Sequence, residues 1–283
     1  MTMDIKLNRD REQSLNPSLN PSLTWNMELL RGEVLESLAA LPGKAGLVFR
    51  PLEGEGAFEY NGDALFESAS VIKLPVYAVV MKLAAEGKLD LSEKLLCREE
   101  DKLPSCGALQ HFTGEFPVDL RTLCALMITV SDNTATNLIL RRFGLDYLNG
   151  QFRELGMEKT RLERLLFDAE ASSRGLENRI CLNEIANLLE RIARGSFVSP
   201  EVSREMENLL RKQQIRHKIP GCLPQGTAVA HKTGDDTGIT NDVGIVFAKR
   251  PFVLCFASNK TDVPEANHFL RGAALKLFEA CSV

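Results

Sequence analysis

The sequence lacks the features that mark proteins which bind nucleic acid, acidic membranes or metal ions. Its 34 Lys and Arg residues are dispersed, and the formal net charge is -4 with a pI near 5.7. No cationic surface for nucleic acid or an anionic membrane is therefore expected. His111, His217 and His268 have no metal-ligand spacing, so neither a metal nor another cofactor is expected.

The chain also lacks a disulfide pattern and a signal peptide. Its seven cysteines are odd in number, scattered and free of any C-x-x-C pair, which is typical of buried, reduced thiols. The first twenty residues are polar and charged, without the apolar core that a signal peptide needs. Taken as it begins, the protein is expected in the cytoplasm. If a leader has been removed, a secreted or periplasmic location is expected instead.

The composition is that of a globular protein with a large core. At 283 residues and 44% hydrophobic content, the chain can form one domain or two closely joined lobes. Residues 1–23 contain the repeat S-L-N-P-S-L-N-P and are expected to be a flexible segment. Helical spacing follows over residues 25–41, and two strand-like runs at 45–50 and 57–60 predict a hairpin.

The order of helical and strand-like segments along the whole chain predicts an α/β (α+β) fold. From about residue 70 to 212 the periodic segments are helical, and strand patterns return before a last helix. Sheet segments at both ends favour one antiparallel five-stranded sheet with flanking helices, into which an all-helical lobe is inserted. We expect three regions: a flexible segment over 1–23, a sheet lobe formed by 24–66 and 214–283, and a helical lobe over 67–213. A cleft is expected where the lobes meet.

Three short strings carry the chemistry: Ser70-Val71-Ile72-Lys73, Ser131-Asp132-Asn133 and Lys232-Thr233-Gly234. Each string alone is weak because its residue types are common. Their order is that of the S-x-x-K, S-D-N and K-T-G motifs of class A β-lactamases and penicillin-binding proteins. All three together are hard to explain as an accident.

Ser70 precedes a predicted helix, where free N–H groups and the helix dipole stabilise a developing oxyanion. Lys73 lies one helical turn further on, on the same face, and burial would lower its pKa enough for a base. This pair is a candidate nucleophile and base. The alternative is that Ser70 is only a helix cap and Lys73 a solvated lysine.

The other two strings also have structural alternatives. Residues 131–133 lie between two apolar helices, and Asp132 there fits a helix cap as well as a catalytic role. Lys232 ends an apolar strand pattern, where a cation is unusual, so a functional role is favoured. His231 is expected to be a packed strand residue.

From about residue 25 to the end, the chain resembles the class A β-lactamase-related serine hydrolases. The resemblance implies that Ser70 is acylated and that Lys73 and Ser131 move the proton. Substrate would be held by Asn133 and by the K-T-G string, with Lys232 and Thr233 near its carboxylate. Gly234 lets another backbone approach closely. The oxyanion would lie between the backbone N–H groups of Ser70 and Asp235.

One departure concerns the loop that carries a water-activating glutamate in true class A β-lactamases. Leu166 stands in the place of that glutamate. Asp168 and Glu170 are nearby acids that would replace it if either reaches a water molecule. The alternative is that both are solvated loop carboxylates.

Three functions remain open at this point. The favoured one is hydrolysis of a β-lactam, a small cyclic amide, through an acyl-enzyme on Ser70. The second is a penicillin-binding-type peptidase or an esterase with the same machinery, and the third is a binder that is acylated slowly without turnover. No feature fixes the oligomeric state, and a monomer is expected.

Overall fold

The computed structural model describes residues 21–283, and side chains from residue 27 onward. The expected flexible segment over 1–23 therefore falls mostly outside the described residues. Helix α1 (Pro21–Ala39) begins within its last three residues. Within residues 21–283, no helix combines the length and the apolar character that crossing a membrane requires.

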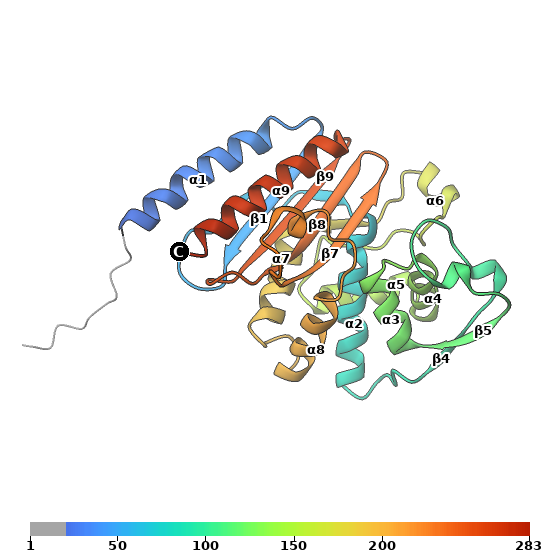
Figure 1. The fold of residues 1–283 in the computed structure, drawn as a ribbon. Helices are drawn as coiled ribbons and strands as arrows, with labels where there is room; N and C mark the ends of the chain where they lie inside the picture. The colour runs from blue at the N-terminus through green and yellow to red at the C-terminus, as the bar shows by residue number, and fades with distance from the viewer. Residues whose placement is uncertain (1–20) are drawn as a thin grey trace, which may run out of the picture.

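The expected antiparallel sheet of five strands is present (Figure 1). Its spatial order is β2 (Phe58–Tyr60), β1 (Lys44–Pro51), β9 (Phe252–Asn259), β8 (Ile239–Val246) and β7 (Val229–Asp236). Strands from the two ends of the chain meet at the centre, where Leu47 pairs with Phe256. Every residue of β8 and β9 is buried. Continuous burial of this kind requires cover on both faces of the sheet.

Helices supply that cover on both sides. Helices α1 and α9 (Val263–Ala280) lie together on one face, over an apolar layer that includes Leu47, Phe256 and Leu277. Helix α7 (Leu182–Ala193) packs on the other face against β1, β8 and β9. The apolar residues between α7 and the sheet belong to the larger core, which extends through the helical lobe. The sheet thus separates two cores.

The lobe is built on a central helix, α2 (Lys73–Ala85), nearly all of whose residues are buried. Helices α3 (Leu120–Thr129), α5 (Leu145–Glu154) and α8 (Pro200–Leu210) pack against it. The lobe also contains α4 (Asn133–Phe143), which packs on α3 and α5, and the short helix α6 (Ala169–Ser173). Single 3-10 turns occur at η1 (Ala69–Ile72), η2 (Glu99–Asp101), η3 (Leu109–His111) and η4 (Ile219–Cys222).

The expectation of an all-helical lobe was wrong in one respect. Two short antiparallel ribbons occur, β4 (Lys94–Cys97) with β5 (Phe116–Asp119), and β3 (Leu65–Glu67) with β6 (Arg179–Cys181). Each strand has only three or four residues, which is too short for a period-two pattern to stand out in sequence. The β3–β6 ribbon ends just before Ser68 and so fixes the chain that leads into η1.

Candidate active site

Ser70 lies within η1, one residue before the position at which the sequence pattern places the start of a helix. Helix α2 itself begins at Lys73. The preceding Ala69 has a φ of 40°, a left-handed conformation that a residue with a side chain seldom adopts. Such strain is typical of functional sites. It turns the chain so that Ser70 lines a cleft of about 730 Å³ between the sheet and the helical lobe.

Strand β7 approaches η1 more closely than a side chain would allow. A Cβ atom on Gly234 would lie 2.9 Å from the Ser68 carbonyl oxygen and 3.1 Å from the Ser70 nitrogen. The following residue, Asp235, also lines the cleft. The backbone of β7 thus runs directly beside the Ser70 amide, which is the arrangement that two N–H donors around one oxyanion require.

Lys73 is fully buried behind Ser70 and is held by the S-D-N string. Its Nζ donates to the Ser131 carbonyl at 2.7 Å, to Ser131 Oγ at 3.1 Å and to Asn133 Oδ1 at 2.8 Å. These three acceptors use all the donors of an ammonium group, whereas a neutral amine keeps two donors and presents a lone pair. No direct bond to Ser70 Oγ is among the contacts of Lys73 within the described residues, and such catalytic bonds often tighten only when substrate is bound.

Ser131 is the meeting point of the two motif lysines. Its Oγ accepts from Lys73 and also from Lys232 Nζ, at 3.0 Å. Its φ of 55° is left-handed, so this residue too is held in a strained conformation. A hydroxyl has two lone pairs and one proton. With both lone pairs facing lysines, the Ser131 proton is free to point toward a bound molecule.

Burial changes the acidity of both lysines. It lowers the pKa of Lys73 well below the ordinary value, and the neighbouring charge of Lys232 lowers it further. Burial also lowers the pKa of Lys232 to about 7, against the opposing attraction of Asp242. Both amines therefore give up a proton more readily than exposed lysines do.

Three of the remaining motif residues have defined structural surroundings. Asp132 caps α4, and its carboxylate accepts from the backbone N–H groups of Ala108, Leu109 and Ala135 at 2.7 to 2.9 Å. The Ala135 contact is the helix cap, whereas the other two hold the segment at Ala108 and Leu109 against the motif. Asn133 lines the cleft and anchors its amide on the Pro104 carbonyl at 3.0 Å. Thr233 is buried in β7, and its carbonyl accepts from Lys232 at 2.8 Å.

A third buried lysine, Lys218, was not found by the sequence analysis. Its Nζ donates to the carbonyls of Gly234 and Asn241, both at 2.9 Å, and pairs with Asp235 at 2.7 Å. Burial lowers its pKa, while Asp235 opposes the shift. Because its partners are mostly backbone oxygens of distant strands, no local motif signals it.

His231 is buried in β7, as expected for a packed strand residue, but it has a specific partner. Its Nδ1 lies 2.9 Å from Asp242 Oδ1, and Oδ2 of the same carboxylate accepts the Ile219 N–H at 3.0 Å. Ile219 directly follows Lys218 in the chain. The His231–Asp242 pair therefore holds the segment from which Lys218 reaches the end of β7.

The loop that closes the cleft opposite the sheet is fixed by two asparagines. Asn137 on α4 exchanges two hydrogen bonds of 2.9 Å with the backbone of Leu166. Asn178 accepts from the N–H groups of Glu163 and Arg164 at 2.8 and 3.1 Å. Leu166 and Phe167 line the cleft at this point, so an apolar surface occupies the wall opposite Ser70.

The structure places the two candidate acids differently. Asp168 lines the cleft, but its Oδ1 also caps α6 by accepting the Ala171 N–H at 2.9 Å. The Glu170 side chain is 85% exposed, lies 3.9 Å from Arg174 and does not line the cleft. Among the described residues there is no group of three His, Cys, Asp or Glu side chains suited to a metal ion.

Comparison with known proteins gives a consistent result. The model of the beta-lactamase enzyme family matches residues 30–281. Beta-lactamase CARB-4 of Pseudomonas aeruginosa is 22% identical over 252 residues, which cover 86% of this chain and 87% of that protein. The structure of PBP-A aligns with a TM-score of 0.81 and 29% identity, covering 89% of this chain and 95% of that one. A leucine-to-glutamate variant of PBP-A, solved as an acyl-enzyme complex with penicillin G, aligns equally well at 28% identity, covering 89% and 96%.

Proposed function

Because the chain belongs to the beta-lactamase enzyme family, we propose that it is a serine hydrolase that opens β-lactams through an acyl-enzyme on Ser70. The observation that carries this proposal is the chain of hydrogen bonds from Lys73 through Ser131 to Lys232, three buried residues of which the first follows Ser70 by three positions. It supplies a base, a proton carrier and a cation in the order that ring opening of a cyclic amide requires.

In the proposed acylation, Ser70 Oγ attacks the lactam carbonyl and its proton passes to neutral Lys73. The tetrahedral oxyanion is held by the N–H groups of Ser70 and Asp235. As the carbon–nitrogen bond breaks, Ser131 gives its proton to the ring nitrogen and recovers one from Lys73. Lys232 and Asn133 hold the substrate, with Thr233 beside its carboxylate. An ester now joins Ser70 to the opened ring.

Release of that ester needs a water molecule and a base, and this step is where the chain departs from a fast β-lactamase. Leu166 itself supplies no carboxylate, and nearby Asp168 is engaged as the cap of α6. Positioned general bases typically contribute about 10²- to 10⁴-fold. We propose that hydrolysis of the acyl-enzyme is slower than its formation. The same observation favours the second candidate, a penicillin-binding-type acyl acceptor or an esterase.

Intact-protein mass spectrometry tests the acylation. After incubation with penicillin G, the parent protein should gain the mass of one intact penicillin, whereas Ser70→Ala should gain none. Peptide mapping should locate the adduct on Ser70. An adduct of equal yield in Ser70→Ala would refute the assignment of the nucleophile.

Rapid-mixing kinetics with a chromogenic cephalosporin then separate the two candidates. A burst of one product per protein followed by a slow linear phase supports acylation with slow release. Rapid hydrolysis of p-nitrophenyl esters, with no reaction on the cephalosporin, would support the esterase instead.

A further inference from the structure

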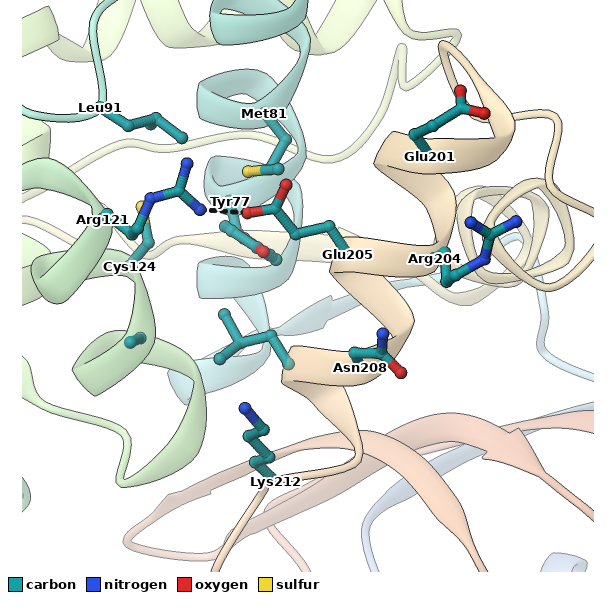
Figure 2. A pocket seen from close by; sticks show the side chains of 12 residues that line it. Tyr77, Met81, Leu91, Arg121, Cys124, Glu201, Arg204, Glu205, Asn208 and Lys212 are labelled. Carbon is teal, nitrogen blue, oxygen red and sulfur yellow. Dashed lines mark hydrogen bonds and ion pairs between the residues drawn. The ribbon is translucent and has the colours of Figure 1, made fainter.

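A second cavity lies between α2, α3 and α8 (Figure 2). Its volume is about 400 Å³, within the range of roughly 300–1,000 Å³ of pockets that hold small ligands. None of the residues that line it lines the Ser70 cleft. Much of the wall is apolar, formed by Met81, Leu91, Ala125 and Leu209.

One polar group is set into this wall. Tyr77 reaches the cavity from α2 and is only 2% exposed, yet its hydroxyl forms no hydrogen bond with the other residues that line the cavity (Figure 2). Burial raises its pKa, so the hydroxyl keeps its proton and remains a donor. Its oxygen is not one of the fully enclosed unpaired atoms of the described residues, so the hydroxyl is open to the cavity. The Tyr77 hydroxyl is therefore placed to donate to an oxygen atom of a bound molecule.

The rim of the cavity is charged. Arg121 and Glu205 form an ion pair across it, with side chains 62% and 44% exposed. Exposed pairs of this kind contribute little stability, so this bridge opens easily. Lys212 forms no ion pair with the described residues, and its side chain lines the cavity from the end of α8 (Figure 2). Arg204 and Glu201 point away from the cavity in the same view.

From these features we propose that the cavity binds a small monocarboxylate with an apolar body the size of a phenylalkyl chain. The apolar body packs against Met81, Leu91 and Leu209, and Lys212 supplies the positive charge that the carboxylate needs. Tyr77 donates to an oxygen of the same molecule. This assignment does not depend on acylation of Ser70, so it can be tested independently of the proposed function.

Methyl NMR of the full chain, with carbon-13-labelled methionine methyl groups, tests the site directly. Phenylbutyrate is the probe, and Met81→Leu identifies the Met81 resonance. We expect a saturable shift of the Met81 signal. Met27, on α1 at the opposite face of the sheet, should not respond. Phenylbutanol, which has the same apolar body without the charge, should bind more weakly.

Three variants complete the test. Leu209→Trp fills the cavity from α8 and should abolish the shift of Met81. Lys212→Gln should weaken binding about two- to fivefold, the usual effect of a partly exposed ion pair. Lys249→Gln, the same change in the exposed turn after β8, should have no effect. Melting curves verify that each variant is folded.

The proposal is wrong if Met81 does not respond to phenylbutyrate, or if the Leu209→Trp protein is folded and binds as the parent does. Equal affinity for phenylbutanol, or equal binding by Lys212→Gln, would overturn the assignment of a carboxylate ligand.

Discussion

Lys73 and Lys232 donate to the same atom, the hydroxyl oxygen of Ser131, from 3.1 and 3.0 Å. Two buried ammonium groups this close repel each other, and the mutual charge is one reason that the pKa of Lys73 is lowered. The two lysines therefore titrate as a coupled pair. The repulsion favours one cation and one neutral amine, which is the combination that substrate binding and base catalysis need.

The pH dependence of acylation follows from this pair. Lys232, with a pKa of about 7, is a cation below that pH and loses its charge above it. If the cation holds a substrate carboxylate, kcat/KM for penicillin G should fall as the pH rises through about 7. Neutral Lys73 is the base, so the rate should also fall at lower pH, where Lys73 becomes protonated. A stopped-flow pH profile should therefore be bell-shaped.

Substitution of Lys232 tests whether loss of its charge causes the fall in kcat/KM at high pH. Lys232→Gln should lower kcat/KM for penicillin G by about 10- to 100-fold, as expected for loss of a charge-assisted hydrogen bond. In this variant kcat/KM should no longer fall as the pH rises through about 7. A neutral p-nitrophenyl ester should be affected much less. Equal loss on both substrates would mean that Lys232 acts in proton transfer rather than in carboxylate binding.

Replacing Leu166 tests the missing base. Its backbone is held by Asn137 on α4, so Leu166→Glu should place a carboxylate at the cleft wall without loss of the loop. We expect hydrolysis of the acyl-enzyme to accelerate by at least about 10²-fold, the lower end of general-base catalysis. Leu166→Gln is the matched control and should leave the slow phase unchanged. Acceleration by both variants would indicate loop opening rather than base catalysis.

The two nearby acids can be separated by their contacts. Asp168 caps α6, and Asn caps a helix about as well as Asp, so Asp168→Asn removes charge while keeping the fold. Because this carboxylate is engaged as a cap and Glu170 is exposed, neither Asp168→Asn nor Glu170→Gln should change the slow phase by more than about twofold. A much longer-lived acyl-enzyme in Asp168→Asn would identify Asp168 as the base.

The sequence predicted the sheet and its helices because those segments are long and periodic. The same reasoning missed β4 and β5, whose four residues each carry no readable period. The family and the motif residues were predictable because three strings occur together in order. Asp132 shows the limit of that approach. One of its backbone partners is the cap of α4 and the other two lie in a neighbouring segment, and no motif distinguishes these structural contacts from a catalytic role.

Long-range contacts account for most of what the sequence did not reveal. Lys218 binds carbonyls of Gly234 and Asn241 that come together only when β7 pairs with β8. The unequal positions of Asp168 and Glu170 likewise depend on how the loop packs against α4. Neither relationship leaves a local pattern of residue types.

The close approach at Gly234 gives the last prediction. A methyl group there would meet the Ser68 carbonyl oxygen at 2.9 Å and the Ser70 nitrogen at 3.1 Å, so Gly234→Ala must push β7 away from η1. The N–H groups of Ser70 and Asp235 would then no longer converge on one oxygen. Loss of a donor of this kind typically lowers the rate about 10²- to 10³-fold, which stopped-flow acylation should detect.

Gly272→Ala is the matched control, since α9 leaves open space around Gly272. It should leave acylation unchanged and stabilise the fold by about 0.5–1 kcal/mol. Unimpaired acylation in a folded Gly234→Ala protein would exclude the Asp235 N–H from the oxyanion site.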